Sequence, residues 1–287
     1  MALSLQQTKR RINNVNSTRK ITNAMYLVAT AKYKSYKNKM DATSVYAHEL
    51  LLAMNQVMAS LDEEQIKQSL SLSEKPKNRN LFIIITSSLG LCGGYNNNIF
   101  KEVKKYLNDE DELIVIGTKG VNYYSKRGFK VDTAYQDLMN GYNVNSVRIV
   151  KNEVESLLKA GEVNKVYVAY TKFVNSITFE PVVEEIYPLD PDSLKIELTI
   201  KEQNTLIEPS HSEVLQYLIP LYLESIINAR IIESNASEQA TRRNAMESAT
   251  DNADEIIADL QIQYNKARQT SITQEITEIV AGANAQE

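Results

Sequence analysis

Proline and glycine are confined almost entirely to the middle of this chain of 287 residues. All six prolines and eight of the nine glycines lie between Pro76 and Pro220, and residues 1–75 and 221–281 contain neither. Inside a helix, proline costs about 3 kcal/mol and glycine about 1 kcal/mol relative to alanine. Each end of the chain can therefore form a very long helix, whereas the middle has the turn residues of a compact domain. The sequence predicts two rods with a globular module between them.

Apolar side chains recur at helical spacing in both end segments. In the first, Ser4-x-x-Gln7 fits a capping box, and the apolar positions that follow are Leu5, Ile12, Val15, Ile21, Met25, Val28 and Ala29, with a second apolar stretch at 50–61. In the last segment, from about 212 to 280, the candidate core positions are Leu215, Leu218, Tyr222, Ile226, Ala229, Ala236, Ala240, Ala253, Leu260, Tyr264 and Ala267. Many of these are alanines, which let two helices approach closely.

The length of the last segment limits how it can be buried. At 1.5 Å per residue, roughly 70 helical residues span about 100 Å. A single domain of this size cannot enclose such a helix, so we expect it to pack along the N-terminal rod, antiparallel or staggered. Thr250-Asp251-Asn252 resembles a cap sequence, which leaves open a break into two helices there.

Charge is distributed unevenly between the two ends. Residues 1–40 carry nine basic residues and no acid, and residues 208–287 carry thirteen acidic and five basic residues. Opposite charge favours pairing of the two ends, although an exposed ion pair contributes only about 0–1 kcal/mol. The alternative is that the basic end is an arm that binds nucleic acid or a membrane surface.

The middle of the chain alternates between strand and helix patterns. We expect strands at 81–86, 112–117, 165–173 and 179–187, a weaker strand at 129–133, and helices at 96–107, 118–127 and 144–160. Residues 62–80 indicate a loop and 189–209 a linker. Such alternation is typical of a mostly parallel sheet, here with an antiparallel hairpin added.

No catalytic constellation stands out. The segment 86–95 contains Gly90-Leu-Cys-Gly-Gly94 between a strand and a helix, but it matches neither phosphate-binding glycine pattern; we interpret it as a tight turn that needs positive φ at one or more glycines. Cys92 has no histidine partner in the sequence, so we do not expect it to be a nucleophile. The carboxylate clusters at 109–112 and at Glu184-Glu185 are interpreted as solvated charge.

Several classes of protein are excluded by residue usage. One cysteine allows no intramolecular disulfide, and with two distant histidines it cannot form a Cys/His zinc site. We expect no metal and no cofactor. The apolar runs are too short to cross a bilayer, and the polar, basic start predicts neither a secretory signal nor an organellar leader.

Three segments resemble the γ subunit of the F-type ATP synthase, the central rotor shaft of that complex. They are residues 16–32, the motif Gly90–Gly94 with 96–100, and residues 249–253 with 264–280. Their order and spacing match across the chain. The resemblance implies N- and C-terminal helices in an antiparallel coiled coil, residues 1–75 and 210–287, with a Rossmann-like α/β foot domain at 76–209.

The resemblance also implies a function without catalysis of its own. The coiled coil would stand inside a hexamer of α and β subunits, three of each, and the foot would sit on the membrane c ring beside ε. Rotation driven by ion flow would then drive ATP synthesis at the β subunits. This implies no nucleic acid partner and a peripheral place on the cytoplasmic face of a bacterial plasma membrane.

Individual positions carry over from the family pattern. Met25 lies where the family has its coupling methionine, and Lys20 matches a basic position of the first segment. The polar contacts to the hexamer would come from Arg242, Arg268, Gln269 and Thr273, and the foot's motif turn from Gly90, Cys92, Gly93 and Gly94. The chain departs from the pattern at Ser88-Leu89, where Asp-Arg is common, and at Asn23, often lysine. We therefore expect no charge-pair role for the segment 86–95.

Two other functions are also compatible with the sequence. One is a nucleotide-binding α/β enzyme with helical arms, which tight ATP binding by the isolated chain would favour. The other is a coiled-coil scaffold that does not rotate, which co-purification without α and β subunits would favour.

Overall fold

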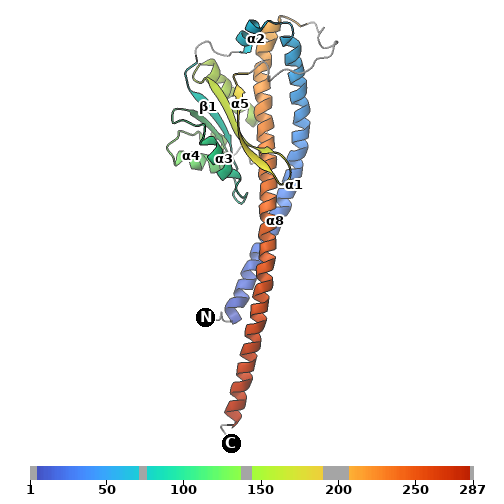
Figure 1. Ribbon diagram of the computed structural model, residues 1–287, viewed down its shortest axis with the longest axis vertical. Helices are drawn as coiled ribbons and strands as arrows, with labels where there is room; N and C mark the ends of the chain where they lie inside the picture. Colours follow the sequence, from blue (N-terminus) through green and yellow to red (C-terminus); the bar gives the residue numbers. More distant parts are fainter. Residues whose placement is uncertain (1–4, 71–75, 137–143, 190–206, 285–287) are drawn as a thin grey trace. The chain divides into compact units, whose positions relative to one another are not determined.

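The computed structural model describes residues 5–70, 76–136, 144–189 and 207–284, and it divides into two compact units (Figure 1). The coil unit comprises residues 1–30 and 242–287, and the foot unit comprises residues 31–241. Two long helices, α1 (Leu5–Met58) and α8 (His211–Asn284), each contribute to both units.

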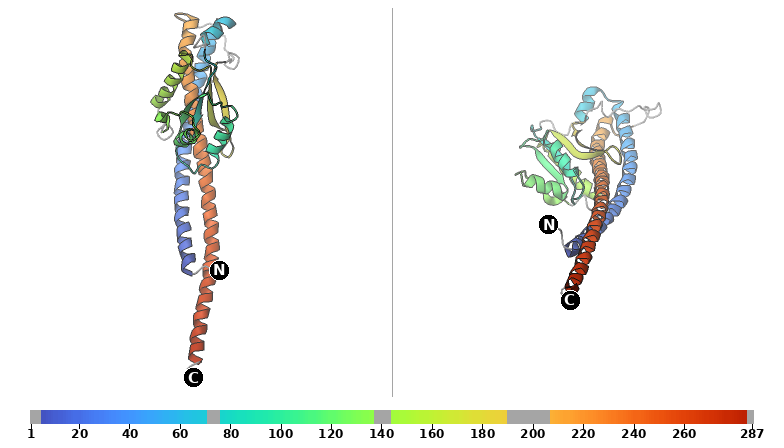
Figure 2. Two further views of the ribbon diagram at one scale, coloured as in Figure 1. Left: turned by 90° about the vertical axis from the view of Figure 1, so that its left-hand side faces the viewer. Right: turned by 60° about the horizontal axis from the view of Figure 1, so that its bottom comes forward.

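In the coil unit, α1 and α8 lie side by side and run antiparallel (Figure 2). The hydroxyl oxygens of Thr22 and Thr250 lie 2.8 Å apart, and Arg19, further back on α1, forms an ion pair with Asp254, further along α8. Both partners of that pair are about half exposed, so it contributes little beyond orientation. The pair nonetheless joins the basic N-terminal segment to the acidic C-terminal segment, as the charge distribution predicts.

The seam between the two helices follows a strict seven-residue repeat. Buried or half-buried positions alternate by three and four residues on both helices: Leu5, Thr8, Ile12, Val15, Arg19, Thr22, Tyr26 and Ala29 on α1, and Met246, Thr250, Ala253, Ile257, Leu260, Tyr264 and Ala267 on α8. A repeat of 3.5 residues keeps one stripe facing a partner when two helices supercoil left-handedly. The expected antiparallel coiled coil is confirmed, with several small or polar side chains on its seam.

Helix α8 has no break at Thr250. The Thr250 hydroxyl donates a hydrogen bond to the Met246 carbonyl one turn earlier, and Thr250 itself occupies a seam position. A hydroxyl that is used within the helix does not cap a new one. The cap-like sequence at 250–252 therefore lies inside a continuous helix.

Helix α1 ends at Met58, within the apolar stretch expected at 50–61. The expectation of a loop at 62–80 was wrong in part. A short helix, α2 (Glu63–Leu70), follows α1. Asp62 and Gln65 form a reciprocal capping box, in which each backbone N–H donates to the other's side chain. Its last residue, Leu70, is 4% exposed, so burial of one apolar side chain accompanies the cap.

The foot unit is built on a four-stranded sheet in the order β2-β1-β3-β4. Its strands are β1 (Asn80–Ile85), β2 (Glu112–Ile116), β3 (Lys165–Phe173) and β4 (Phe179–Tyr187). β1 pairs parallel with β2 and β3, and β3 pairs antiparallel with β4. The mixed sheet and the hairpin agree with the sequence interpretation, including the bounds of β3 and β4.

Helices cover both faces of the sheet. The short helices α3 (Tyr95–Val103) and α4 (Thr118–Ser125) pack on the face that carries Phe82 and Ile84. The other face, with Ile83 and Ile85, packs against α5 (Val144–Lys159) and against parts of α1 and α8. Alternate residues of β1 thus enter two different apolar cores, which explains its continuous apolar run.

Two local expectations in the foot were wrong. Residues 129–133 form no strand, and a short 3₁₀ helix, η1 (Thr133–Tyr135), follows them. Phe129 and Val131 instead pack against the core beneath α3 and α4. Helix α3 ends at Val103 rather than at 107. Ser4 and most of the linker, residues 190–206, lie outside the described part of the chain.

We expect Leu260→Ala to destabilise the coil unit by about 2–4 kcal/mol, because Leu260 is 3% exposed on the seam and its removal leaves a cavity. Ile262, on the same helix, is 68% exposed, so Ile262→Ala should change stability by less than about 0.5 kcal/mol. Helix-resolved amide exchange of the full chain checks both. Equal effects would contradict the seam.

A second prediction concerns the turn after β2. A Cβ at Gly117, which has φ of 99°, would lie 2.1 Å from the Thr86 carbonyl oxygen. Gly117→Ala should therefore cost about 3 kcal/mol or more through overlap and backbone strain together. Gly128 also has positive φ, 87°, but open space around it. Gly128→Ala should cost only about 1–2 kcal/mol. Denaturant unfolding of the foot unit measures the difference.

Candidate coupling surface on the paired helices

Met25 lies beside the seam of the coil unit rather than on it. Its side chain is half-buried, and one turn away on either side Ile21 and Val28 are 61% and 56% exposed. We call Ile21, Met25 and Val28 the α1 apolar stripe. Ile21 and Val28, which the apolar spacing put on one helical stripe with Met25 and Ala29, lie outside the seam, because the strict repeat gives the seam to Thr22, Tyr26 and Ala29.

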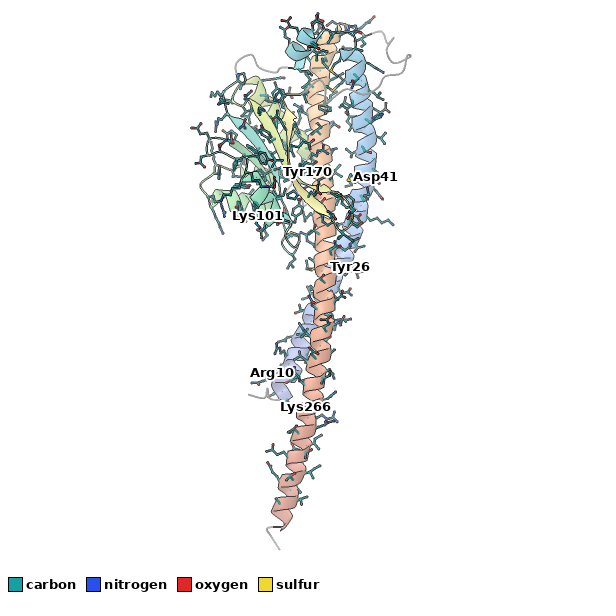
Figure 3. The ribbon with its side chains drawn as sticks, in the orientation of Figure 1. Arg10, Tyr26, Asp41, Lys101, Tyr170 and Lys266 are labelled. Carbon is teal, nitrogen blue, oxygen red and sulfur yellow. The ribbon has the colours of Figure 1, made fainter. Side chains whose placement is uncertain are left out.

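One basic side chain lies beside this stripe. Lys20 is exposed directly before Ile21, and Arg10 and Tyr26 mark the course of α1 in the coil unit (Figure 3). An exposed apolar stripe next to a cationic side chain offers both non-directional contact and charge to a partner. Met25 and Lys20 are therefore placed where a partner could reach them.

Helix α8 continues beyond the described end of α1. Leu5 lies seventeen residues before Thr22, and seventeen residues after Thr250 bring Ala267 to the same level. From Arg268 to Asn284, α8 therefore passes no described residue of α1, as Figures 1 and 2 also show. Arg268, Gln269 and Thr273 lie on this extension, and all three are exposed.

The threonines of the extension use their hydroxyl protons within the helix. Thr270, Thr273 and Thr277 each donate to a carbonyl four residues earlier, at 3.1, 2.9 and 2.8 Å. Each oxygen keeps an acceptor site and each side chain presents a methyl group outward. The Gln269 amide supplies donors on the same face of the helix, whereas the Arg268 guanidinium supplies donors on another face. Lys266, labelled in Figure 3, lies one turn before Thr270.

The sequence interpretation missed an apolar component of the extension. Ile272, Ile276, Ile279 and Val280 are between 42% and 71% exposed. Their spacing of four, three and one residues forms a stripe on one side of a helix. The sequence contains a signal for this stripe. Apolar residues continue at helical spacing in α8 beyond the last residue that the shorter N-terminal helix can cover.

Arg242 differs from the other sequence-predicted contacts. It is 5% exposed, so its guanidinium presents almost no surface to a partner. Its direct contact with the hexamer stays a prediction.

The motif turn of the foot unit is a folded turn around Asn96. The Asn96 side chain accepts the Ser87 N–H at 3.0 Å and donates to the Ser87 hydroxyl at 2.7 Å. Gly93 has φ of 55°, as a glycine turn requires, and Leu91 also has positive φ, 62°. Gly90 and Gly94 have ordinary φ. Gly94 precedes the first residue of α3, without a side-chain cap.

Cys92 is buried in this turn. Its sulfur lies 3.7 Å from the Ser87 hydroxyl and 3.5 Å from the Asn96 amide nitrogen. Neither neighbour is a base that could activate a thiol. Among the described residues, His, Cys, Asp and Glu form no group that could hold a metal ion. Within the same residues, no helix has the length and apolarity to cross a membrane.

The carboxylates interpreted as solvated charge are in part structural. Asp111 is 8% exposed and accepts the backbone N–H groups of Asn80 and Asn108, which ties β1 to the start of β2. Glu184 and Glu185 form ion pairs with Arg230 and Lys165. That interpretation was wrong for Asp111 and Glu184, because Asn80 and Arg230 are distant from them in the sequence, whereas Glu185 is exposed.

Comparison with known proteins agrees along nearly the whole chain. Residues 4–286 match the family model described as ATP synthase. The chain is 37% identical over 282 residues to the ATP synthase gamma chain of Mycoplasma capricolum, with 98% of each chain covered. It is 39% identical over 290 residues to the ATP synthase gamma chain of Alkaliphilus metalliredigens, with 99% of each covered.

Solved structures share the fold. A chain of the Euglena gracilis mitochondrial ATP synthase, in an OSCP/F1/c-ring structure, matches with a TM-score of 0.67 at 14% identity, covering 98% of this chain and 94% of its own. A chain of the Tetrahymena thermophila mitochondrial ATP synthase central stalk and c ring matches with a TM-score of 0.56 at 25% identity, covering 80% and 99%. The family match and the full-length relatives show that this chain belongs to the ATP synthase γ chain family, as a non-catalytic subunit of the central stalk.

Proposed function

We propose that the coil unit is the part of this central-stalk subunit that turns inside a hexamer of α and β subunits, and that the foot unit attaches to ε and to the c ring. The observation that carries the proposal is the extension of α8 past the described end of α1. A single helix with exposed isoleucines and polar side chains is poorly stabilised alone. A surrounding partner would cover it.

The mechanism is a difference in contact free energy. A rotating shaft changes the state of a β subunit only if its surface favours one conformation at one angle and another conformation at the next. The coil unit offers such an uneven surface. One side of α1 carries the α1 apolar stripe, whereas acidic Asp251, Asp254 and Glu255 lie exposed on α8.

Met25 and Lys20 would act together on α1. Met25 can adapt its unbranched side chain to partners of changing shape, and Lys20 would be drawn to acidic groups of the hexamer. On α8, Arg268 and Gln269 would donate hydrogen bonds to carbonyl or carboxylate groups, and Thr273 would contribute contact area. Arg242, which is buried, would hold α8 in place.

The motif turn would serve the same function indirectly. Gly90, Cys92, Gly93 and Gly94 connect β1 to α3, and the Asn96 hydrogen bonds hold the turn in one conformation. This would give the foot unit a rigid surface at the start of α3. In a bacterium, the subunit would lie on the cytoplasmic face of the plasma membrane, attached through the complex.

Co-purification tests the assembly. A tagged form of the chain should bring down α and β subunits, three of each, together with ε. Recovery of a partner without α and β would instead support a coiled-coil scaffold. Tight ATP binding by the isolated chain would support an enzyme.

The first functional prediction is that Met25→Lys separates hydrolysis from transport. A second ammonium near Lys20 changes the angle-dependent contacts but removes no seam residue, so assembly should survive. ATP-driven ion uptake into vesicles should fall several-fold more than ATP hydrolysis. Asn122→Lys adds the same charge on an exposed turn of α4 and serves as the control. Equal loss of assembly and uptake in Met25→Lys would contradict the role.

Truncations provide a second functional prediction. Ending the chain after Val280 keeps the seam residues of α8 and all three polar contacts of the extension, whereas ending it before Tyr264 removes the seam residues Tyr264 and Ala267 and all three polar contacts. The longer truncation should therefore reduce rotation-coupled ATP hydrolysis far more than the shorter one. The measurement is the hydrolysis rate of the purified complex per assembled particle. The opposite order would rule out the extension as a contact zone.

A further inference from the structure

Torque has to pass between the sheet of the foot unit and the helices that accompany it. Most of the contact between α8 and the sheet is apolar, through Leu215, Ile219, Leu223, Ile227 and Ile231. Apolar packing is strong but non-directional. It holds a helix against a sheet without fixing the helix's rotation about its own axis as firmly as directed hydrogen bonds can.

One turn of α8 carries directed contacts instead. The Ser234 hydroxyl accepts the Thr171 N–H of β3 at 3.3 Å and lies 2.7 Å from the Tyr95 hydroxyl of α3. The Tyr95 hydroxyl also donates to the Ser234 carbonyl at 3.2 Å. Ser234 is 0% exposed. A single side chain on α8 is thus tied to two separate elements of the foot.

The neighbouring residues extend this attachment along the hairpin. Glu233 accepts the Phe173 N–H at 3.1 Å, where β3 ends. Arg230, one turn before Ser234, donates to Glu184 of β4 at 2.7 Å and to Glu233 at 3.2 Å. We call Arg230, Glu233 and Ser234 on α8, with Thr171, Phe173 and Glu184 on the hairpin, the clamp.

The Arg230–Glu184 pair is more than a solvated surface contact. The side chains are 27% and 31% exposed, and the guanidinium lies 5.0 Å from the centre of the Tyr170 ring, labelled in Figure 3. Burial alone would lower the pKa of Arg230, but the hydrogen bond and charge of Glu184 outweigh it and raise the pKa. Partly buried ion pairs contribute little net stability, and geometric specificity is their better-supported use.

The hairpin also reaches the other helix. Figure 1 shows the β3–β4 hairpin, in yellow, crossing α8 toward α1. The centres of the Phe173 ring and of the Tyr33 ring of α1 lie 6.0 Å apart, and the Lys37 ammonium of α1 lies 5.4 Å from the centre of the Phe173 ring. The hairpin therefore contacts α1 and α8 at once, within the foot unit.

We propose that the clamp transmits torque between the foot domain and the long helices, with Ser234 as its central positioning residue. The clamp resists rotation of α8 against the sheet, because a turn of the helix would break the hydrogen bonds that Thr171, Phe173 and Tyr95 make with it and the ion pair to Glu184 together. This inference rests on the proposed rotor function. It assigns to Ser234, Glu233 and Arg230 a mechanical role in coupling, distinct from the contacts with the hexamer.

The test compares buried serines on one helix. Ser234→Ala removes the bonded hydroxyl. Ser225 and Ser237 are also buried on α8, at 3% and 0% exposed, and their hydroxyls have no hydrogen-bond partner among the described residues. Ser225→Ala and Ser237→Ala therefore make the same chemical change without removing a directed contact. All three are studied in the assembled complex.

Amide exchange shows whether the bond holds the hairpin. In Ser234→Ala, exchange of the Thr171 N–H should accelerate by about tenfold, the effect of one hydrogen bond in a folded region. The two control variants should leave it unchanged. Unchanged exchange in Ser234→Ala would overturn the proposal at its first step.

Behaviour under load shows whether the clamp carries torque. A probe on Lys101→Cys of α3, with the hexamer immobilised, should show a wider angular spread in Ser234→Ala than in Ser237→Ala. ATP-driven ion uptake should also stop at a smaller gradient, while unloaded ATP hydrolysis stays equal. Glu233→Gln, which keeps an oxygen acceptor for Phe173, should retain more stiffness than Glu233→Ala. Faster exchange with unchanged spread and gradient would mean a purely structural bond and would overturn the proposal.

The same experiment separates this inference from the rotor function itself. If the chain were not a rotor, the unmodified complex would show neither load-dependent uptake nor rotation of the probe. If only the clamp were wrong, the unmodified complex and all serine variants would behave alike.

Discussion

The structure of the coil unit depends on contact between two segments from opposite ends of the chain. Thr22 and Thr250 are 228 residues apart in sequence and touch through their hydroxyls. Neither helix has an apolar surface wide enough to be stable alone, since most side chains outside the seam are exposed. Each rod is therefore helical because the other covers its stripe, and α8 loses that cover beyond Ala267. The exposed isoleucines of its last turns follow from this geometry.

The composition of the seam favours close approach over maximal burial. Ala29 and Ala253 are almost fully buried, and threonines occupy several positions that leucine or isoleucine would fill in a more stable coiled coil. Small residues let the helix axes come closer, which makes the pair thin. They also leave the larger apolar side chains, such as Ile21 and Val28, on the outside. A thin shaft with an uneven outer surface suits a subunit whose contacts have to differ from one angle to the next.

The sequence predicts the arrangement well wherever local pattern and global fold agree. The absence of proline and glycine marks α1 and residues 221–281 of α8, although Pro220 lies inside the first turns of α8, and the strand pattern predicts the bounds of β3 and β4 to the residue. It fails where partners are distant. The sequence predicts a loop at Asp62, but Asp62 caps α2 together with Gln65. It predicts a solvated Glu184, but Glu184 forms an ion pair with Arg230, which is distant in the sequence. Periodicity also could not separate Ile21 from Thr22, because a step of three or four fits both until the partner helix selects one.

The clamp lies where the packing of α8 changes character. From Leu215 to Ile231 its buried residues recur every four positions, and a four-residue step turns the buried face by about 40° each time around the helix. From Met246 onward the steps alternate between four and three, so the buried face stays on one side of the supercoil. Between these two regimes every residue from Ser234 to Ala240 is buried, so burial alone does not define which face of α8 meets the sheet. Arg230, Glu233 and Ser234 occupy the end of the first regime, where directed bonds to β3, β4 and α3 supply the orientation that apolar spacing no longer specifies.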